Sequence, residues 1–444
     1  MQEKTKIKQS KKLAKGVKSS KGITLIALVI TIIVLLILAA VSIATLTGEN
    51  GILTRANEAK TETEEAKEDE LRRLTAAEAA TNLEEYEYED PSGEKVIIPA
   101  KCAVSQVEGE NTLENGLVII DANGNEWVWV EVPKDIYTNK TFNEGLEPNG
   151  ENDFVNIEKV MRNYTKEYDK GNINQNYDFF IDKWYAWDEN GNISISEETA
   201  TEQQKELSNG CGLTLEEYNE LKNRMLKSVY LNGGFWIGRY ETGLEGEMDK
   251  ISPRTSNTPI YIDAVIQAKK YPYNFVTCED AEKLALQVSP NSNNTSNLLF
   301  GIQWDLVCKY IETKKFNNAD KINTDSTEWG NYANSEFDIS LDSRKSQDDG
   351  KSWVKIQDKN KKINTDKMLL STGASDKNKV LNIFDFAGNA QEYTLEFSTS
   401  NSPCVIRGGN YGNDGNSIPV STRNTRNTSK EFKYGNTTFR VCLY

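Results

Sequence analysis

Apolar residues form one unbroken run near the N-terminus and become sparse directly after it. The run, Ile23 to Leu46, has 24 residues and no charge. A helix of that length would be about 36 Å long, enough to cross a hydrocarbon core. Residues 1–22 before it carry eight Lys and one Glu, and such a basic flank stays in the cytoplasm. The pattern predicts a single-pass membrane helix over 23–46 with the C-terminal bulk outside the cell.

Residues 47–92 follow as a charged segment. From Leu53 to Asp90 the chain is rich in Ala, Glu and Lys and has no Pro or Gly. Its apolar positions are too few to establish a coiled coil, which stays open as an alternative. We predict a solvated helical stalk.

From residue 93 the pattern changes to short strands, turns and amphipathic helices. Leu117–Ile120 reads as a buried strand and Trp127–Val132 as an alternating one. A capping box at Thr214 and Glu217 predicts a helix that ends at Gly233. The predicted class is α+β with long loops.

Further elements follow along the same domain, residues 93–444. Residues 235–242 read as a strand, and residues 277–288 and 302–313 as two short amphipathic helices. Residues 138–212, rich in Asn, Glu and Gly, are expected to be a loop-rich insertion.

The net charge and the missing residue types exclude several functions. The formal net charge is −15 and the chain has no histidine. An acidic surface argues against nucleic acid as a partner, since phosphate binding needs clustered Lys and Arg. The absence of histidine excludes Ser-His-Asp catalysis and the commonest zinc ligand.

The six cysteines show no CxxC spacing, so they indicate neither a metal site nor a redox motif. Cys404 and Cys442 flank the terminal segment and could form a disulfide if the chain is exported. We prefer the interpretation that the cysteines are buried free thiols.

The N-terminus resembles that of type IV prepilins and type II secretion pseudopilins. The matching residues are the basic leader, Lys21-Gly22 and then Ile23-Thr24-Leu25-Ile26. The resemblance implies a bacterial membrane location, an extracellular C-terminal domain, and cleavage by prepilin peptidase between Gly22 and Ile23. Members of the family usually carry Glu at the fifth mature position, where this chain has Ala27. An anchor or a minor subunit is therefore favoured over a major pilin with other pilins as partners.

The outer domain resembles the formylglycine-generating-enzyme, or sulfatase-modifying-factor, family. The matching pieces are NEWVWVEVP, GGFWIGRYETG, NIFDFAGNAQEYT, RGGNY and TTFRV, in that order. The resemblance implies a variant of the C-type lectin fold over about residues 94–444.

The family's metal chemistry carries over only in part. Family members bind copper(I) through two cysteines, and those positions fall here on Ile418 and Arg423. Neither side chain can form a thiolate, so no copper and no oxidase activity are expected. The family also binds calcium beside its GN-x-x-E motif. The resemblance implies a structural Ca²⁺ held by Asp385, Glu392 and the backbone carbonyls of Gly388 and Ala390.

The terminal segment, residues 405–444, keeps the framework Arg-Gly-Gly and Phe-Arg-Val and is otherwise small and polar. Such residues, with Tyr, are typical of adaptable binding loops, so we expect a surface for an extracellular protein or glycan. The expected ligand-binding residues are Asn410, Tyr411, Asn413, Asn416, Ser417, Ile418, Arg423, Asn424, Asn427, Tyr434 and Asn436.

The favoured hypothesis is a membrane-anchored bacterial surface protein with a catalytically inert, ligand-binding head. Lectin-fold domains that end in RGG…FR also serve as variable proteins of diversity-generating retroelements. Those elements alter adenines, which favours Asn codons, and the segment is rich in Asn. Two alternatives stay open, a minor pilin or pseudopilin subunit and an enzyme of the formylglycine-generating type with altered chemistry.

Overall fold

The computed structural model describes most of the 444-residue chain and divides it into two compact units, residues 1–68 and 69–444. The described ranges are 25–47, 51–168, 180–188, 193–260, 263–289, 291, 294–357, 360–398, 404–426 and 433–444.

The smaller unit is helical. Helix α1 is Leu25–Thr47 and helix α2 begins at Ile52, as the apolar run and the charged segment predicted. Across the described ranges, no helix combines the length and the apolar character that a membrane crossing requires. The predicted cleavage residues, Gly22 and Ile23, lie outside the described residues.

The predicted stalk helix is shorter than expected. Helix α2 ends at Thr81, and the chain then forms a hairpin of β1 (Tyr86–Glu89) and β2 (Lys95–Ile98). In β1 the sequence Tyr-Glu-Tyr-Glu alternates half-buried and exposed side chains, which is the period of a strand rather than of a helix. The prediction of a helical stalk up to residue 92 is therefore wrong over residues 82–92.

The larger unit contains a six-stranded antiparallel sheet with the order β12-β24-β9-β5-β4-β3. Both predicted strands are confirmed, as β4 and β5, and the predicted strand over 235–242 is β9. The strands are β12 (Ser296–Leu298), β24 (Val441–Leu443), β9 (Gly234–Gly238), β5 (Glu126–Glu131), β4 (Val118–Asp121) and β3 (Cys102–Val104).

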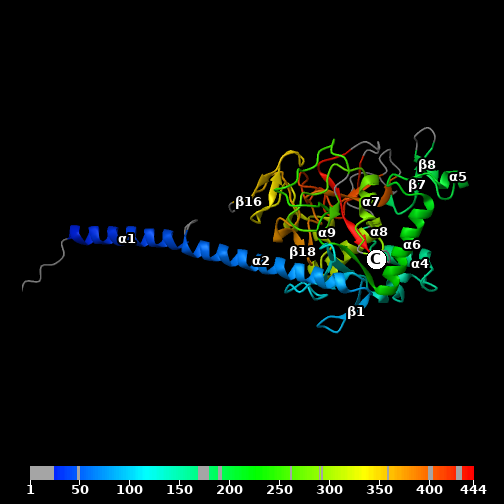
Figure 1. The fold of residues 1–444 in the computed structure, drawn as a ribbon, viewed down its shortest axis with the longest axis horizontal. Helices are drawn as coiled ribbons and strands as arrows, with labels where there is room; N and C mark the ends of the chain where they lie inside the picture. The colour runs from blue at the N-terminus through cyan, green and yellow to red at the C-terminus, as the bar shows by residue number, and fades with distance from the viewer. Residues whose placement is uncertain are drawn as a thin grey trace, which may run out of the picture. The chain divides into compact units, whose positions relative to one another are not determined.

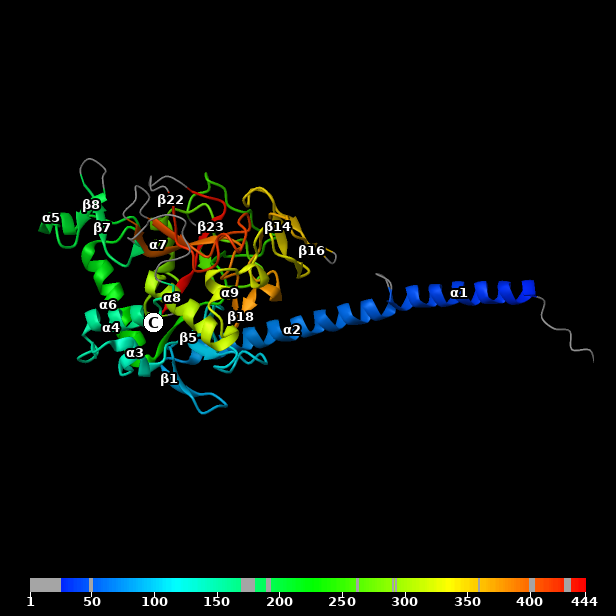
Figure 2. The ribbon, with the colours of Figure 1, turned by 180° about the vertical axis from the view of Figure 1, so that it is seen from behind.

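Helices pack on this sheet and on one another. Helix α6 (Leu215–Asn232) contacts β9, and α8 (Gly301–Ile311) contacts β5. Helix α4 (Phe154–Tyr164) contacts both helices. The two views agree in placing the C-terminus beside α6 and α4 (Figures 1 and 2), and the Tyr444 hydroxyl donates to the Leu221 carbonyl of α6 at 3.0 Å.

The predicted start and end signals of α6 are both present. Thr214 and Glu217 form the capping box, and Gly233 ends the helix with a φ of 77°. Glycine adopts this left-handed conformation without the steric cost that a side chain brings. The two short amphipathic helices are also confirmed, as α7 (Cys278–Ala285) and α8.

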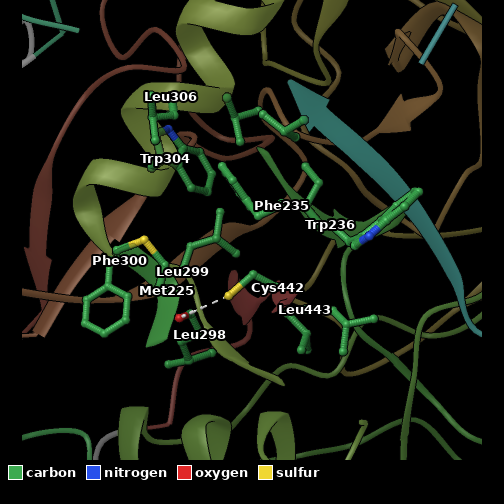
Figure 3. Packing of buried hydrophobic residues seen from close by; sticks show 14 of the residues in the cluster. Met225, Phe235, Trp236, Leu298, Leu299, Phe300, Trp304, Leu306, Cys442 and Leu443 are labelled. Atoms are coloured by element: carbon green, nitrogen blue, oxygen red, sulfur yellow. Dashed lines mark hydrogen bonds between the residues drawn. The ribbon is translucent and has the colours of Figure 1, made fainter. Parts of the chain in front are cut away.

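Buried apolar side chains from β9, β12, β24, α6 and α8 form one core (Figure 3). Cys442 lies in this core and its thiol donates to the Leu298 carbonyl at 3.8 Å. All six cysteines are free thiols, five of them buried and Cys404 half-buried. The preferred interpretation, buried free thiols, is confirmed for five of the six.

The described parts of the insertion over 138–212 contain more regular structure than a loop-rich segment. It contains α4, whose buried residues Ile157, Val160, Met161 and Tyr164 join the core. It also contains the hairpin of β7 (Tyr185–Trp187) and β8 (Ile193–Ser196), which lies at an edge of the larger unit (Figure 2).

A second sheet carries the terminal segment. Its order is β22-β21-β20-β23, and β6 also pairs with β20. Strand β23 is parallel to β20, whereas β21 is antiparallel to it. The strands are β22 (Asn424–Arg426), β21 (Cys404–Arg407), β20 (Gln391–Ser398), β23 (Thr437–Phe439) and β6 (Phe180–Ile181).

Candidate functional site

The terminal segment begins with β21 and turns sharply at Gly408 and Gly409. Their φ angles are 89° and 69°, in the left-handed region that favours glycine. The Gly408 carbonyl accepts hydrogen bonds from the Tyr332 hydroxyl and the Gly388 N–H, both at 2.8 Å. The Arg-Gly-Gly turn is thereby joined to the turn that precedes β20.

Four buried charged side chains hold the two ends of the next loop. Arg407 and Arg423 each contact both Asp305 and Glu396. Arg407 lies 2.7 Å from Asp305 and 3.0 Å from Glu396. Arg423 binds one oxygen of each acid and also donates to the Tyr168 carbonyl. We call this group the ion-pair quartet. Its two positive and two negative charges are matched in number.

Arg423 therefore does not contribute to a binding surface. Its side chain is 1% exposed and its guanidinium is engaged on all three nitrogens. Burial alone would lower its pKa, but Asp305 and Glu396 raise the pKa above its ordinary value. The expectation that Arg423 contacts a ligand is corrected by this placement, because a buried charge needs its partners.

A second buried ion pair lies where β20 begins. The Arg440 guanidinium donates to Glu392 Oε1 at 2.7 Å and, through Nε, to Glu392 Oε2 at 3.0 Å. It also donates to the carbonyls of Gly238 at 2.8 Å and Phe384 at 2.9 Å. Both residues of the pair are about 1% exposed or less. Arg440 thus ties β20 to β9 and to the turn before β20.

Two more carboxyl groups are buried close to that pair. Glu241 accepts the Ala390 N–H at 2.9 Å and the Asn389 amide at 2.8 Å. Asp385 accepts the Gly373 N–H through Oδ2 at 2.7 Å, and its Oδ1 is buried without a hydrogen-bond partner in the described structure. The turn over 385–390 is therefore fixed by carboxylates rather than left open.

Burial shifts the ionisation of all three acids in the same direction. It raises the pKa of Asp385 to about 6, against the opposing effects of the Gly373 N–H and Arg440. Burial also raises the pKa of Glu392, although Arg440 counteracts it. The pKa of Glu241 lies well above its ordinary value because of burial and of its carboxylate neighbours Asp385 and Glu392.

The four predicted calcium positions come together in this turn, but they offer few free oxygens. Ca²⁺ takes six to eight oxygen ligands. Both Glu392 oxygens are bound by Arg440. Within the ranges that the structure describes, no group of three or more His, Cys, Asp or Glu side chains could hold a metal ion. The residues fit calcium poorly as arranged, and calcium at Asp385, Gly388, Ala390 and Glu392 stays a prediction.

Three expected ligand-binding residues lie around Asp349. Tyr411 is 6% exposed and its hydroxyl donates to the Asp349 carboxylate. Tyr434 and Asn436 are half-buried. Gly435 between them lies so close that an added Cβ would be 2.0 Å from the Asp349 carbonyl oxygen. Tyr411 therefore supports the surface from beneath, with Tyr434 and Asn436 beside it.

The loop after Gly409 is held by its own amides. Asn410 donates its N–H to Asn413 Oδ1 at 3.0 Å, and Asn410 Oδ1 accepts the Gly412 N–H at 2.8 Å. The Gly415 N–H donates to Asn334 Oδ1 at 3.0 Å. Asn410 is buried and Asn413 half-buried, so both amides define the shape of the loop.

Three of the remaining expected residues are exposed, two in this loop and one at the start of β22. Asn416, Ser417 and Asn424 are exposed and Ile418 is half-buried. Asn427 lies outside the described residues. Short polar side chains thus stand between positions that are buried and ion-paired. We call Asn416, Ser417 and Asn424 the exposed polar face.

Sequence reasoning missed the acids that hold this segment in place. Asp305 lies within the apolar helix α8, and Glu396 within a strand that is buried along its whole length. In α8 the available signal was an acid flanked by Trp304 and Leu306, because a charged residue among apolar ones needs an opposite charge nearby. Glu396 gave no such signal, since polar and apolar residues alternate around it in β20, as in a strand with one solvated face. Nothing local indicated which arginine would supply the opposite charge.

Comparisons with known proteins identify no family for this chain. No family model and no curated protein match the chain. Among solved structures it is similar to Treponema denticola variable protein 1, at 11% sequence identity and a TM-score of 0.21. The match covers 81% of this chain and 98% of that one.

Proposed function

We propose that the larger unit is a ligand-binding head whose binding surface is built on the terminal segment. The observation that supports this is the separation of roles along the segment. Arg407, Arg423 and Arg440 are fully buried in ion pairs, whereas the exposed polar face consists of short side chains. A surface of this kind can change its side chains without disturbing the charges that fix its backbone.

The residue types of the face suit recognition better than catalysis. Asn and Ser offer hydrogen-bond donors and acceptors at low entropic cost, and neither titrates near neutral pH. The positions that correspond to the copper cysteines of the formylglycine-generating family are Ile418 and Arg423. Arg423 is bound within the ion-pair quartet, so we propose no oxidase chemistry there. A protein or a glycan is the proposed class of ligand.

Replacing the exposed polar face should abolish binding and leave the fold intact. We expect the variant Asn416→Ala/Ser417→Ala/Asn424→Ala to lose at least 10-fold in capture by an array of cell-surface glycans and extracellular proteins. The melting temperature should stay within about 2 °C of wild type, since exposed substitutions rarely cost more than about 0.5 kcal/mol each.

The matched control uses the same residue types elsewhere on the head. Asn115, Asn123 and Ser208 are exposed, and their triple alanine variant should bind as wild type does. Equal losses in both variants would mean that general surface polarity, and not this face, carries the binding. Unchanged capture by the first variant would place the binding surface elsewhere.

We also propose that the segment is diversified by a retroelement. The support is the set of Asn residues at 410, 413, 416, 424, 427 and 436. Deep sequencing of the whole gene in a population of the source bacterium should show adenine-centred variation confined to codons 405–444. The codons of Asn416 and Asn424 should vary, and those of Arg407, Arg423 and Arg440 should not. Variation spread evenly over the whole gene would contradict the proposal.

Display on a bacterial cell membrane completes the proposal. It is supported by the sequence pattern of residues 1–46, a basic leader followed by an uncharged run. A minor pilin or pseudopilin remains the second candidate for the same pattern, and the absence of Glu at position 27 speaks against it. Isolated filaments that contain this chain would favour the second candidate.

A further inference from the structure

Three of the six cysteines meet at one place, where β21 begins. The sulfur atoms of Cys211 and Cys278 are 2.8 Å apart. The Cys404 thiol lies 3.8 Å from the Gly210 carbonyl, next to Cys211, and its side chain also interacts with Cys278. Non-bonded heavy atoms usually pack at about 3.5–4.0 Å, and a disulfide bond is about 2.05 Å long. The first two thiols are therefore closer than ordinary packing brings them.

Local structure fixes the backbone on both sides of the close pair. The Asn209 side chain accepts the N–H groups of Cys211 at 2.9 Å and Leu213 at 3.0 Å. Cys278 is the first residue of α7, directly after the capping box of Thr277 and Asp280. Because both backbones are held, the two sulfur atoms have little freedom to move apart.

The remaining thiols lie apart from this cluster. Cys102, Cys308 and Cys442 are buried, and none of them is hydrogen-bonded to another sulfur atom in the described structure. Cys442 instead donates to the Asn297 carbonyl at 3.3 Å. The sequence also allowed a Cys404–Cys442 disulfide. The thiols are not placed to form it, because Cys404 lies with Cys211 and Cys278 and Cys442 lies apart from them.

We propose that Cys211 and Cys278 form a reversible disulfide, and that Cys404 is the thiol through which oxidation begins. The oxidant is a small-molecule disulfide. Cys404 is half-buried, whereas Cys211 and Cys278 are buried, so the oxidant reaches Cys404 first. Burial also raises the pKa of Cys278 well above its ordinary value, which suppresses the thiolate needed for direct attack on an external disulfide.

The exchange proceeds in three balanced steps. The Cys404 thiolate attacks one sulfur of the small disulfide, forms a mixed disulfide and releases the first small thiol. Cys278 then attacks the Cys404 sulfur and releases the second small thiol. Finally Cys211 attacks the Cys278 sulfur, which forms the Cys211–Cys278 bond and returns Cys404 as a thiol. Two protein thiols are oxidised and one small disulfide is reduced to two thiols.

The bond would join the turn before α6 to the start of α7, two points 67 residues apart in sequence. A crosslink across a chain segment of that length restricts the unfolded state strongly. We expect oxidation to raise the melting temperature by roughly 5–10 °C, and reduction with dithiothreitol to reverse the rise.

The test is peptide mapping of the full chain after incubation with glutathione disulfide. Free thiols are alkylated in denaturant before digestion. Mass spectrometry should find one crosslinked peptide pair, containing Cys211 and Cys278, and the other four cysteines alkylated. The variant Cys404→Ser should form the same crosslink at least 10-fold more slowly. The control Cys102→Ser, which removes a buried thiol outside the cluster, should form it at the wild-type rate.

Three results would contradict the proposal. Six alkylated cysteines after oxidation of the wild-type chain would show that the close pair does not form a bond. A crosslink between Cys404 and Cys442 would show that oxidation joins a different pair of thiols from the proposed one. If Cys404→Ser forms the crosslink at the wild-type rate, the role of Cys404 fails. The mapping needs no bound ligand, so its outcome is independent of the binding function proposed above.

Discussion

Replacing Arg423 by alanine should lower the free energy of unfolding of the larger unit by about 3–5 kcal/mol. The substitution removes one of two positive charges from the ion-pair quartet and leaves Asp305 and Glu396 buried with Arg407 alone. A carboxylate away from water without its partner is costly. Urea unfolding of the full chain, followed by tryptophan fluorescence, would measure the loss, since Trp304 adjoins Asp305 in α8 and its ring faces Arg407 at 5.4 Å.

Asn424 supplies the control from the next position in the chain. It is exposed, so Asn424→Ala should change stability by no more than about 0.5 kcal/mol. If Arg423→Ala instead unfolds at the wild-type urea concentration and loses only ligand capture, Arg423 would be the ligand contact that its place in the sequence predicted. Comparing the two neighbouring substitutions thus distinguishes a residue that stabilises the fold from one that only faces solvent.

Asp385 should make the larger unit less stable as the pH rises from about 4 to about 6. Its pKa is raised from the ordinary value of 3.8 to about 6 in the fold. Below pH 3.8 the carboxyl is protonated in both states and costs nothing. As the pH rises the unfolded chain loses the proton first, so stability is lost until the folded group also ionises near pH 6. The full effect is about 3 kcal/mol.

Asp385→Asn should remove this dependence, because an amide does not ionise. Asn tolerates the left-handed conformation at this position, where φ is 57°. We expect the variant to gain on wild type between pH 4 and pH 7 in urea unfolding. Asp376→Asn, at an exposed carboxylate, should change stability by at most about 0.5 kcal/mol throughout this pH range. A constant difference between Asp385→Asn and wild type across this range would show that Asp385 is not held protonated by burial.

The parts of the fold that could be predicted from the sequence are those with local signals. Helix α6 has a capping box at its N-terminus and Gly233 at its C-terminus. Both signals act on backbone groups only a few residues away. Strands β4 and β5 are predicted by short apolar runs on either side of a turn. Residues 86–89 carry charge and lack Pro and Gly, which favours a helix, but their two-residue alternation of Tyr and Glu is the period of a strand, and a strand forms.

The candidate site was less predictable, because long-range contacts decide which polar residues are exposed. Arg423 and Asn424 are neighbours in sequence, yet one is 1% exposed and the other lies on the surface. The difference arises from Asp305, 118 residues away, and Glu396, 27 residues away. Composition predicted a binding segment, but it could not separate residues that shape the loop from those that face outward.

The position of β24 in the six-stranded sheet has a consequence for how the chain is made. This strand lies between β12 and β9, although it comprises residues 441–443, close to the last residues of the sequence. The sheet cannot close until those residues have left the ribosome. A frameshift or premature stop codon within the terminal segment would therefore remove an interior strand and leave a chain that cannot fold. We therefore expect a change of reading frame in this segment to destroy the sheet, whereas in-frame substitutions on the exposed polar face leave β24 in place.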